Sequence, residues 1–205
     1  MKLKAFLWLF GAILMAGSFS GAHGQIVSPA ARERRLPIAL GFGMSNFDLD
    51  WGSDKNGERR MAGITATLDT DLPHASGILK GFELEIEGRD INYFQPVGLS
   101  SMRQSTILGG AVYSWPYSQR ARPYAKYLWG LGSIDASRVG PYRHDTQMVM
   151  APGGGLECKV FGPLWVRGDY EYQFWPNFFG RGTLNPNGFT ISTVYDFRTR
   201  RRNQY

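Results

Sequence analysis

The sequence predicts an all-β fold, an eight-stranded antiparallel up-and-down transmembrane β-barrel, and three observations carry this prediction. Eight segments alternate apolar and polar residues with the period of two that marks a strand with two different faces. Each segment is about ten residues long, which is the length that a tilted strand needs to cross a bilayer. Their connections alternate between long polar loops and shorter turns, a pattern typical of transmembrane barrels.

The chain begins with a predicted secretory signal peptide, residues 1–24. Two lysines precede an apolar run at residues 5–16, and small residues then lead to a cleavage site near Gly24. The apolar run is too short to span a membrane as a helix. After export we therefore expect a short periplasmic segment at 25–35, followed by the barrel at 36–197.

Each of the eight expected strands has an apolar face and a polar or small-residue face. In the sixth, Pro152 and the three glycines that follow it predict a bend or bulge. The expected strands are, in order, 37–44 (PIALGFGM), 61–69 (MAGITATLD), 81–94 (GFELEIEGRDINYF), 105–115 (STILGGAVYSW), 123–133 (PYAKYLWGLGS), 147–160 (QMVMAPGGGLECKV), 164–175 (LWVRGDYEYQFW) and 187–197 (NGFTISTVYDF).

The third strand decides which face points inward, because it carries glutamates at three alternate positions. Carboxylates face lipid only at a high cost, so this column must face the lumen, where like charges need opposing cations. Eight strands enclose a space that side chains just fill, so we expect an ion-paired, plugged lumen rather than an open pore. The predicted lumen network comprises Glu83, Glu85, Glu87, Arg89, Arg103, Lys126, Arg167, Asp169 and Glu171.

The opposite faces of the strands are expected to contact lipid. The residues predicted to face lipid are Phe42, Ile64, Leu84, Ile86, Leu108, Trp129, Val166, Tyr170, Tyr172, Ile191, Tyr195 and Phe197. In the fourth strand Ile107 and Leu108 are both apolar, which leaves the phase of that strand open. Trp115 and Trp175 lie at strand ends, where interfacial aromatic residues gather.

The composition excludes several function classes. The single cysteine, Cys158, excludes an intramolecular disulfide framework. Of three histidines, one leaves with the leader and the other two are isolated, so no metal site is expected. No cofactor is expected either, because the glycine-rich run at 151–157 lacks the Lys-Ser/Thr of a phosphate-binding loop.

The charge of the chain indicates little about a partner. The formal net charge is +6, and two of these charges leave with the leader. The basic tail at 198–205 is expected to be solvated in the periplasm, with contact to anionic lipid or cell-wall polymer as the alternative. Nucleic acid is not an expected partner, because an exported chain meets little of it.

These features resemble the small outer-membrane β-barrels of the opacity-protein and outer-membrane protein A transmembrane-domain type. The resemblance covers nearly the whole mature chain and is carried by the signal peptide, the strand count, VRGDYEYQFW at 166–175 and the closing YDF at 195–197. It implies a location in the outer membrane of a Gram-negative cell, and contacts with membrane lipid and the barrel assembly machinery. Eight residues follow Phe197, whereas the terminal strands of such barrels end on an aromatic residue.

Three functions remain open at this point. The favoured one is a structural or adhesive outer-membrane barrel that is not an enzyme and that binds a surface ligand through its loops. The second is an enzyme that acts on lipid A, like the barrel deacylases that use a His, a Ser and an acid; the nearest feature here is His144-Asp145-Thr146. The third is a soluble exported barrel that holds an apolar ligand as lipocalins do, which would require the apolar faces to point inward.

Overall fold

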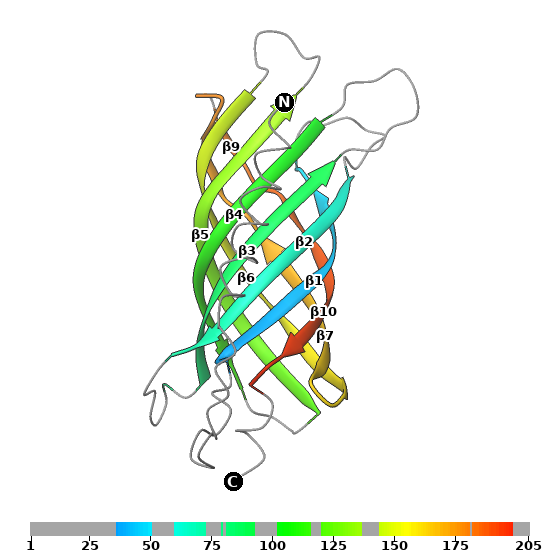
Figure 1. The fold of residues 1–205 in the computed structure, drawn as a ribbon. Helices are drawn as coiled ribbons and strands as arrows, with labels where there is room; N and C mark the ends of the chain where they lie inside the picture. The colour runs from blue at the N-terminus through cyan, green and yellow to red at the C-terminus, as the bar shows by residue number, and fades with distance from the viewer. Residues whose placement is uncertain are drawn as a thin grey trace, which may run out of the picture. The chain divides into compact units, whose positions relative to one another are not determined.

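The alternating segments pair into one closed antiparallel barrel in the computed structural model of the chain (Figure 1). The predicted signal peptide, the periplasmic segment and the tail after Arg198 lie outside the described residues. Among the described residues no helix has the length and apolar character needed to cross a membrane. The structure describes residues 36–50, 60–72, 79, 81–92, 102–115, 120–136, 144–180 and 182–198.

Eight strands form the barrel, which confirms the predicted fold class and strand count. Around the barrel the order is β1-β10-β7-β6-β5-β4-β3-β2, so strands that follow one another in sequence are neighbours, and β1 and β10 close the ring. The two remaining strands, β8 and β9, form a separate hairpin. The barrel strands are β1 (Ile38–Asp48), β2 (Arg60–Asp71), β3 (Phe82–Asn92), β4 (Met102–Ser114), β5 (Ala121–Ala136), β6 (His144–Phe161), β7 (Leu164–Tyr172) and β10 (Asn187–Asp196), and the hairpin strands are β8 (Trp175–Phe178) and β9 (Gly182–Leu184).

The connections divide the barrel ends into two rims. We call the end at which β1, β3, β5 and β7 end and β2, β4, β6 and β10 begin the loop rim. At the opposite end, the turn rim, β1, β3, β5 and β7 begin and β2, β4, β6 and β10 end. The tightest turn contains Gly162, whose φ of 52° favours glycine.

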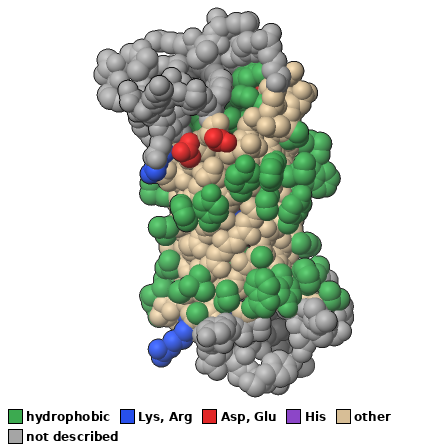
Figure 2. All heavy atoms as spheres, turned by 180° about the vertical axis from the view of Figure 1, so that it is seen from behind, with side chains coloured by type: hydrophobic (Ala, Val, Ile, Leu, Met, Phe, Trp, Pro, Cys, Tyr) green, Lys and Arg blue, Asp and Glu red, His purple; other side chains and the backbone are tan. Residues whose placement is uncertain are grey.

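The outer wall of the barrel is apolar. Figure 2 shows hydrophobic side chains over one face, with acidic and basic side chains only near the two ends. The side chains predicted to face lipid lie on this outer wall, with one exception. They are Phe42, Ile64, Leu84, Ile86, Trp129, Val166, Tyr170, Ile191, Tyr195 and Phe197, all exposed, and Tyr172, which is half-buried and has its ring centroid 4.8 Å from that of Phe174.

The exception is Leu108, for which the prediction was wrong. Its side chain is only 1% exposed and lies inside the barrel, whereas Ile107 points outward with 60% exposure. Strand β4 carries glycines at 109 and 110 and apolar residues on both faces, so its alternation did not determine its phase. Cross-strand pairing with β3 and β5 determines it instead.

Trp175 also lies elsewhere than predicted. Trp115 is exposed on the outer wall, but Trp175 is completely buried inside the barrel. It begins β8, and its ring occupies the space beside Gly132, where an added Cβ would come within 2.2 Å of the indole. The hairpin thus places an aromatic side chain within the loop-rim end of the barrel.

The predicted bulge at Pro152 is absent from the ladder between β5 and β6. Pairing continues without a shift from Ala121 opposite Cys158 to Asp135 opposite His144. The irregularity in β6 lies at the turn rim instead, between Lys159 and Phe161 in the pairing with β7. The glycines after Pro152 serve close packing: a Cβ on Gly153 would lie 3.2 Å from Cε of Lys126.

Candidate functional site

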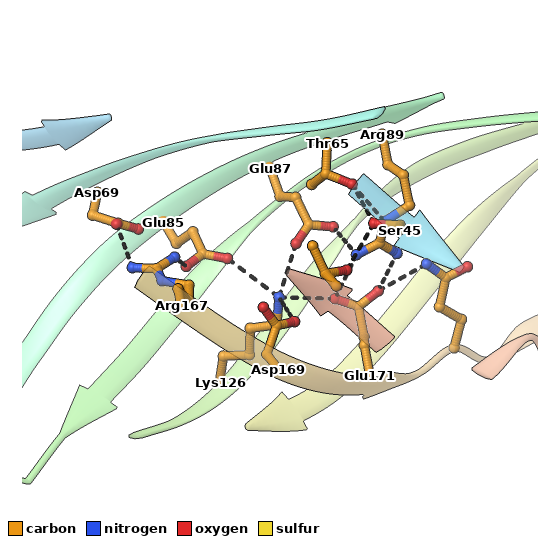
Figure 3. Close-up of polar contacts among 12 residues, drawn as sticks. Ser45, Thr65, Asp69, Glu85, Glu87, Arg89, Lys126, Arg167, Asp169 and Glu171 are labelled. Carbon is orange, nitrogen blue, oxygen red and sulfur yellow. Dashed lines mark hydrogen bonds and ion pairs between the residues drawn. The ribbon is translucent and has the colours of Figure 1, made fainter. Parts of the chain in front are cut away.

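The interior of the barrel contains a network of buried charges whose centre is Lys126 of β5. Its Nζ atom lies 2.8 Å from a carboxylate oxygen of Glu87 and 3.0 Å from one of Glu171. Asp169 follows at 3.2 Å and Glu85 at 3.5 Å. Figure 3 shows these four carboxylates converging on the ammonium group from β3 and β7. One cation therefore ties opposite walls of the barrel together.

Arg89 extends the network toward the loop rim. Its guanidinium donates to Glu171 at 2.7 Å and lies 2.6 Å from an oxygen of Glu87. Its Nε donates to Thr65, which in turn hydrogen-bonds Ser45. The guanidinium carbon also lies 4.1 Å from the centre of the Phe47 ring, a cation–π contact.

Arg167 extends the network toward the turn rim and contacts three carboxylates. Its guanidinium nitrogens lie 2.6 Å from Asp69, 2.9 Å from Glu85 and 2.6 Å from Glu157 (Figure 3 shows the first two). These carboxylates come from β2, β3 and β6, while the arginine comes from β7. The planar guanidinium fork suits such shared contacts better than an ammonium would.

A second group of charges lies at the turn rim. The guanidinium of Arg122 stacks 3.5 Å from the centre of the Trp165 ring and lies 3.4 Å from Asp196. Arg198, just after β10, contacts Glu83 and Asp71 at 2.7 Å and Asp196 at 3.0 Å. Burial lowers the pKa of Arg198, but the surrounding carboxylates raise it more, so the net pKa lies above its ordinary value.

The loop-rim end of the interior is apolar instead. Hydrogen bonds join this layer to the charges: Gln173 accepts from Gln104 at 2.9 Å and from the Trp175 indole at 3.0 Å, and donates to Glu171 at 2.8 Å. The buried apolar residues of this layer are Phe47, Leu49, Met61, Ile91, Met102, Leu108, Leu128, Ile134, Val149, Ala151, Trp175, Phe178 and Leu184.

The structure brings eight of the nine residues of the predicted lumen network inside the barrel, all buried: Glu83, Glu85, Glu87, Arg89, Lys126, Arg167, Asp169 and Glu171. Arg103 is the exception, and that prediction was wrong. Its side chain is 47% exposed on the outer wall, where it pairs with Asp90. It lies an odd number of residues from the inward Gln104 and Thr106, so the pleat of β4 turns it outward.

Sequence reasoning missed five charged residues of the interior. Asp69, Arg122, Glu157, Asp196 and Arg198 are all buried there. Alternation along the strands could have predicted that two of them face inward. Arg122 shares its strand face with Lys126, and Glu157 points opposite to the exposed Cys158. Arg198 was assigned to a solvated tail because it follows the last expected strand.

The outer face of the loop rim contains a hydrogen-bonded chain of three side chains. Nδ1 of His144 lies 2.5 Å from a carboxylate oxygen of Asp135, and its Nε2 lies 3.1 Å from the hydroxyl of Thr146. The residues lie on neighbouring strands, because Asp135 of β5 pairs with His144 of β6. All three side chains are exposed.

Comparison with known families and structures points to one class of protein. A family described as "Outer membrane protein beta-barrel domain" matches residues 12–197. Neisserial surface protein A is similar with a TM-score of 0.63 at 9% identity, over 78% of this chain and 97% of that chain. Ail, the attachment invasion locus protein of Yersinia pestis, is similar with a TM-score of 0.54 at 10% identity, over 77% and 97%. No curated protein matches the sequence.

Proposed function

Because the chain belongs to the outer membrane protein β-barrel family, whose members lie in the outer membrane of Gram-negative cells, we propose that it is a structural and adhesive barrel. Its interior is plugged by side chains, and its loops bind a ligand outside the cell. It is not an enzyme, and outer-membrane lipid and the barrel assembly machinery are its other partners.

The observation that carries this proposal is the filled interior. Three layers of buried side chains follow one another along the barrel: apolar residues at the loop rim, the network around Lys126, and the Arg122–Trp165 stack at the turn rim. An eight-stranded barrel leaves no room beyond its side chains. These layers of described residues support a lumen that is closed to solute, and a closed lumen leaves the surface of the barrel as the place where a ligand can bind.

The loop rim is the surface best suited to such a role. Outer-membrane barrels place their longer loops outside the cell and their short turns in the periplasm. Here the segments 49–59 and 173–186 supply charges, aromatic residues and turn-forming residues on a rigid scaffold. One protein with this fold is named for attachment and invasion, which supports an adhesive use of the fold without assigning it to this chain.

Replacing residues 52–57 with an equal length of Gly-Ser chain tests the proposal. We expect the variant to fold, with the different gel migration before and after boiling that a folded barrel shows. Binding of bacteria that display it to host cells or matrix proteins should be lost. The matched control replaces 73–78 at the turn rim and should leave binding intact. Equal binding by both variants and the parent would contradict a role for the first loop.

One observation favours a second function, hydrolysis of a lipid acyl ester. The chain from Asp135 through His144 to Thr146 has the order acid, imidazole, hydroxyl that activates a nucleophile in serine hydrolases. It lies at the outer end of the barrel wall. All three groups are exposed, however, and no oxyanion-stabilising donors accompany them in the described contacts.

Mass spectrometry of lipid A from cells that express the protein distinguishes the two functions. An acyl loss that Thr146→Ala abolishes and Thr146→Ser retains would establish the hydrolase. Unchanged lipid A, with normal heat-modifiable migration of the expressed protein, supports the adhesive barrel instead.

A further inference from the structure

The buried charges at the centre of the barrel do not balance. Each of the acidic and basic side chains concerned is buried, and the acidic ones outnumber the basic ones by six to three. The acidic residues are Asp69, Glu85, Glu87, Glu157, Asp169 and Glu171, and the basic residues are Arg89, Lys126 and Arg167. An uncompensated charge is unfavourable where the side chains are this deeply buried, so we expect the surplus negative charge to be at least partly neutralised.

At the turn rim, in contrast, the buried charges balance. Glu83 and Asp196 lie there against Arg122 and Arg198, two charges of each sign. Asp71 also contacts Arg198, but its side chain is 45% exposed and solvated. Arg122 also lies 3.7 Å from Glu157 of the central group, but the described interior as a whole still contains eight buried acidic side chains against five buried basic ones.

Asp69 and Glu85 bring two of the surplus negative charges close together. The two residues are direct cross-strand partners on β2 and β3, and both point inward. One oxygen of each carboxyl group is held by Arg167. The other oxygens, Oδ1 of Asp69 and Oε1 of Glu85, are buried and make no hydrogen bond among the described residues, although Oε1 of Glu85 lies 3.5 Å from Nζ of Lys126. Like charges directly opposite in a sheet repel.

We propose that the folded barrel retains a proton at neutral pH that Asp69 and Glu85 share, held between Oδ1 of Asp69 and Oε1 of Glu85. A proton there supplies the missing donor, removes one charge of the surplus and turns a repulsive pair into a hydrogen-bonded one. Two carboxyl groups that share a site behave in this way when their charges cannot both be accommodated.

The surroundings of the pair favour a proton over a metal ion. The charged and titratable groups that face the pair are Arg167 and Asp169 of β7, Lys126 and Tyr124 of β5, and Glu157 of β6. Two of these groups are cations close to the carboxyl groups, which repel a further metal cation. Within the part of the chain that the structure describes, no group of three or more potential ligands is arranged to hold a metal ion.

Proton uptake during folding tests the proposal. The chain, unfolded in urea, is diluted into detergent micelles at about pH 7 with an indicator dye, where ordinary carboxyl groups are ionised and the histidines are the same in every variant compared. The parent protein should take up protons as it folds. Glu85→Gln should take up about one proton fewer per chain, because the amide is already neutral and can donate to Asp69.

Glu83→Gln is the matched control, because it lies two residues away on the same face of the same strand but in the balanced group. It should take up as many protons as the parent. Infrared spectra of the folded parent, which require no variant, should show the carbonyl stretch of a protonated carboxyl group, and this band should weaken in Glu85→Gln only.

Two results would overturn the proposal. One is a parent protein that takes up no proton and shows no protonated carboxyl band, above all if added sodium or potassium raises its stability, because a bound cation would then neutralise the surplus. The other is an equal loss of uptake in both variants. Neither result depends on whether the loops bind a ligand.

Discussion

At the residue scale, the interior is held by a few cations that each serve several carboxylates. Lys126 contacts four and Arg167 contacts three. Because of this sharing, loss of a cation should cost more stability than loss of a carboxylate. Without the cation several carboxylates are unpaired, whereas without one carboxylate the repulsion among the others is weaker.

Arg167→Ala and Glu85→Ala should therefore differ in their cost. Breaking a buried pair by removing one partner typically costs about 3–5 kcal/mol, and we expect Arg167→Ala to reach that range because three carboxylates lose their partner. Glu85→Ala should cost much less, and the double variant less than the sum of both. Urea unfolding midpoints in detergent micelles measure the three values. Equal costs that simply add would contradict a shared network.

Arg198 gives a second prediction at this scale. Arg198→Ala leaves Glu83 and Asp196 buried without their closest cation, so it should lower stability by about 3–5 kcal/mol. Arg103→Ala is the control, since the exposed pair with Asp90 should be worth only about 0–1 kcal/mol. The same unfolding assay measures both. If Arg103→Ala lowers stability more than Arg198→Ala does, then Arg198 does not contribute to the folded barrel.

At the scale of the strand, alternation separates an apolar outer wall from an inner wall that carries the charges. Strand β3 illustrates it, with Leu84 and Ile86 exposed and Glu83, Glu85 and Glu87 buried. A one-residue slip would exchange the two sets, so the register of this strand is strongly specified.

Ile86→Arg tests which environment the outer face meets. Ile86 lies near the middle of β3, and an arginine at the bilayer midplane of a barrel costs about 2–4 kcal/mol. The matched control is Leu36→Arg, at an exposed apolar position before β1, where the cost should fall to about 0–1 kcal/mol. Folding yield into lipid vesicles, read from heat-modifiable migration, reports both. Equal yields would argue against lipid contact at position 86.

At the scale of the whole molecule, the interior changes character along the barrel. The apolar layer contains side chains from the wall and from the β8–β9 hairpin, whereas the charged layer below it is built by barrel strands alone. The contacts around Lys126 are made by barrel strands without the hairpin, so loss of the hairpin should leave that network in place.

Planar bilayer recordings test this independence. The parent protein should show no steady conductance, and neither should a variant in which Gly-Gly replaces residues 176–183, because the network around Lys126 still spans the interior. Heat-modifiable migration serves as the control for folding. Sustained channels of nanosiemens size in the parent would contradict a plugged lumen, and channels in the variant alone would assign the closure to the hairpin.

The sequence by itself determined the fold class, the strand count and most of the facing of side chains, because a period of two and strand length are local properties. Alternation was clear in β3, where Glu85 is buried in the interior and Ile86 is exposed on the outer wall. Where a strand lacked polar contrast, as at Leu108, the phase depended on pairing with neighbouring strands, and local pattern could not decide it.

Only the tertiary structure decided which charges meet. Lys126 and Glu171 are far apart in sequence, and their contact follows from closure of the ring and the stagger of its strands. The same closure brings Arg198 against Glu83 and Trp175 into the interior. No local pattern in the sequence therefore predicted the apolar layer at the loop rim. Partners across a barrel depend on its shear, a property of all eight strands together, whereas the facing of each residue depends only on its own strand.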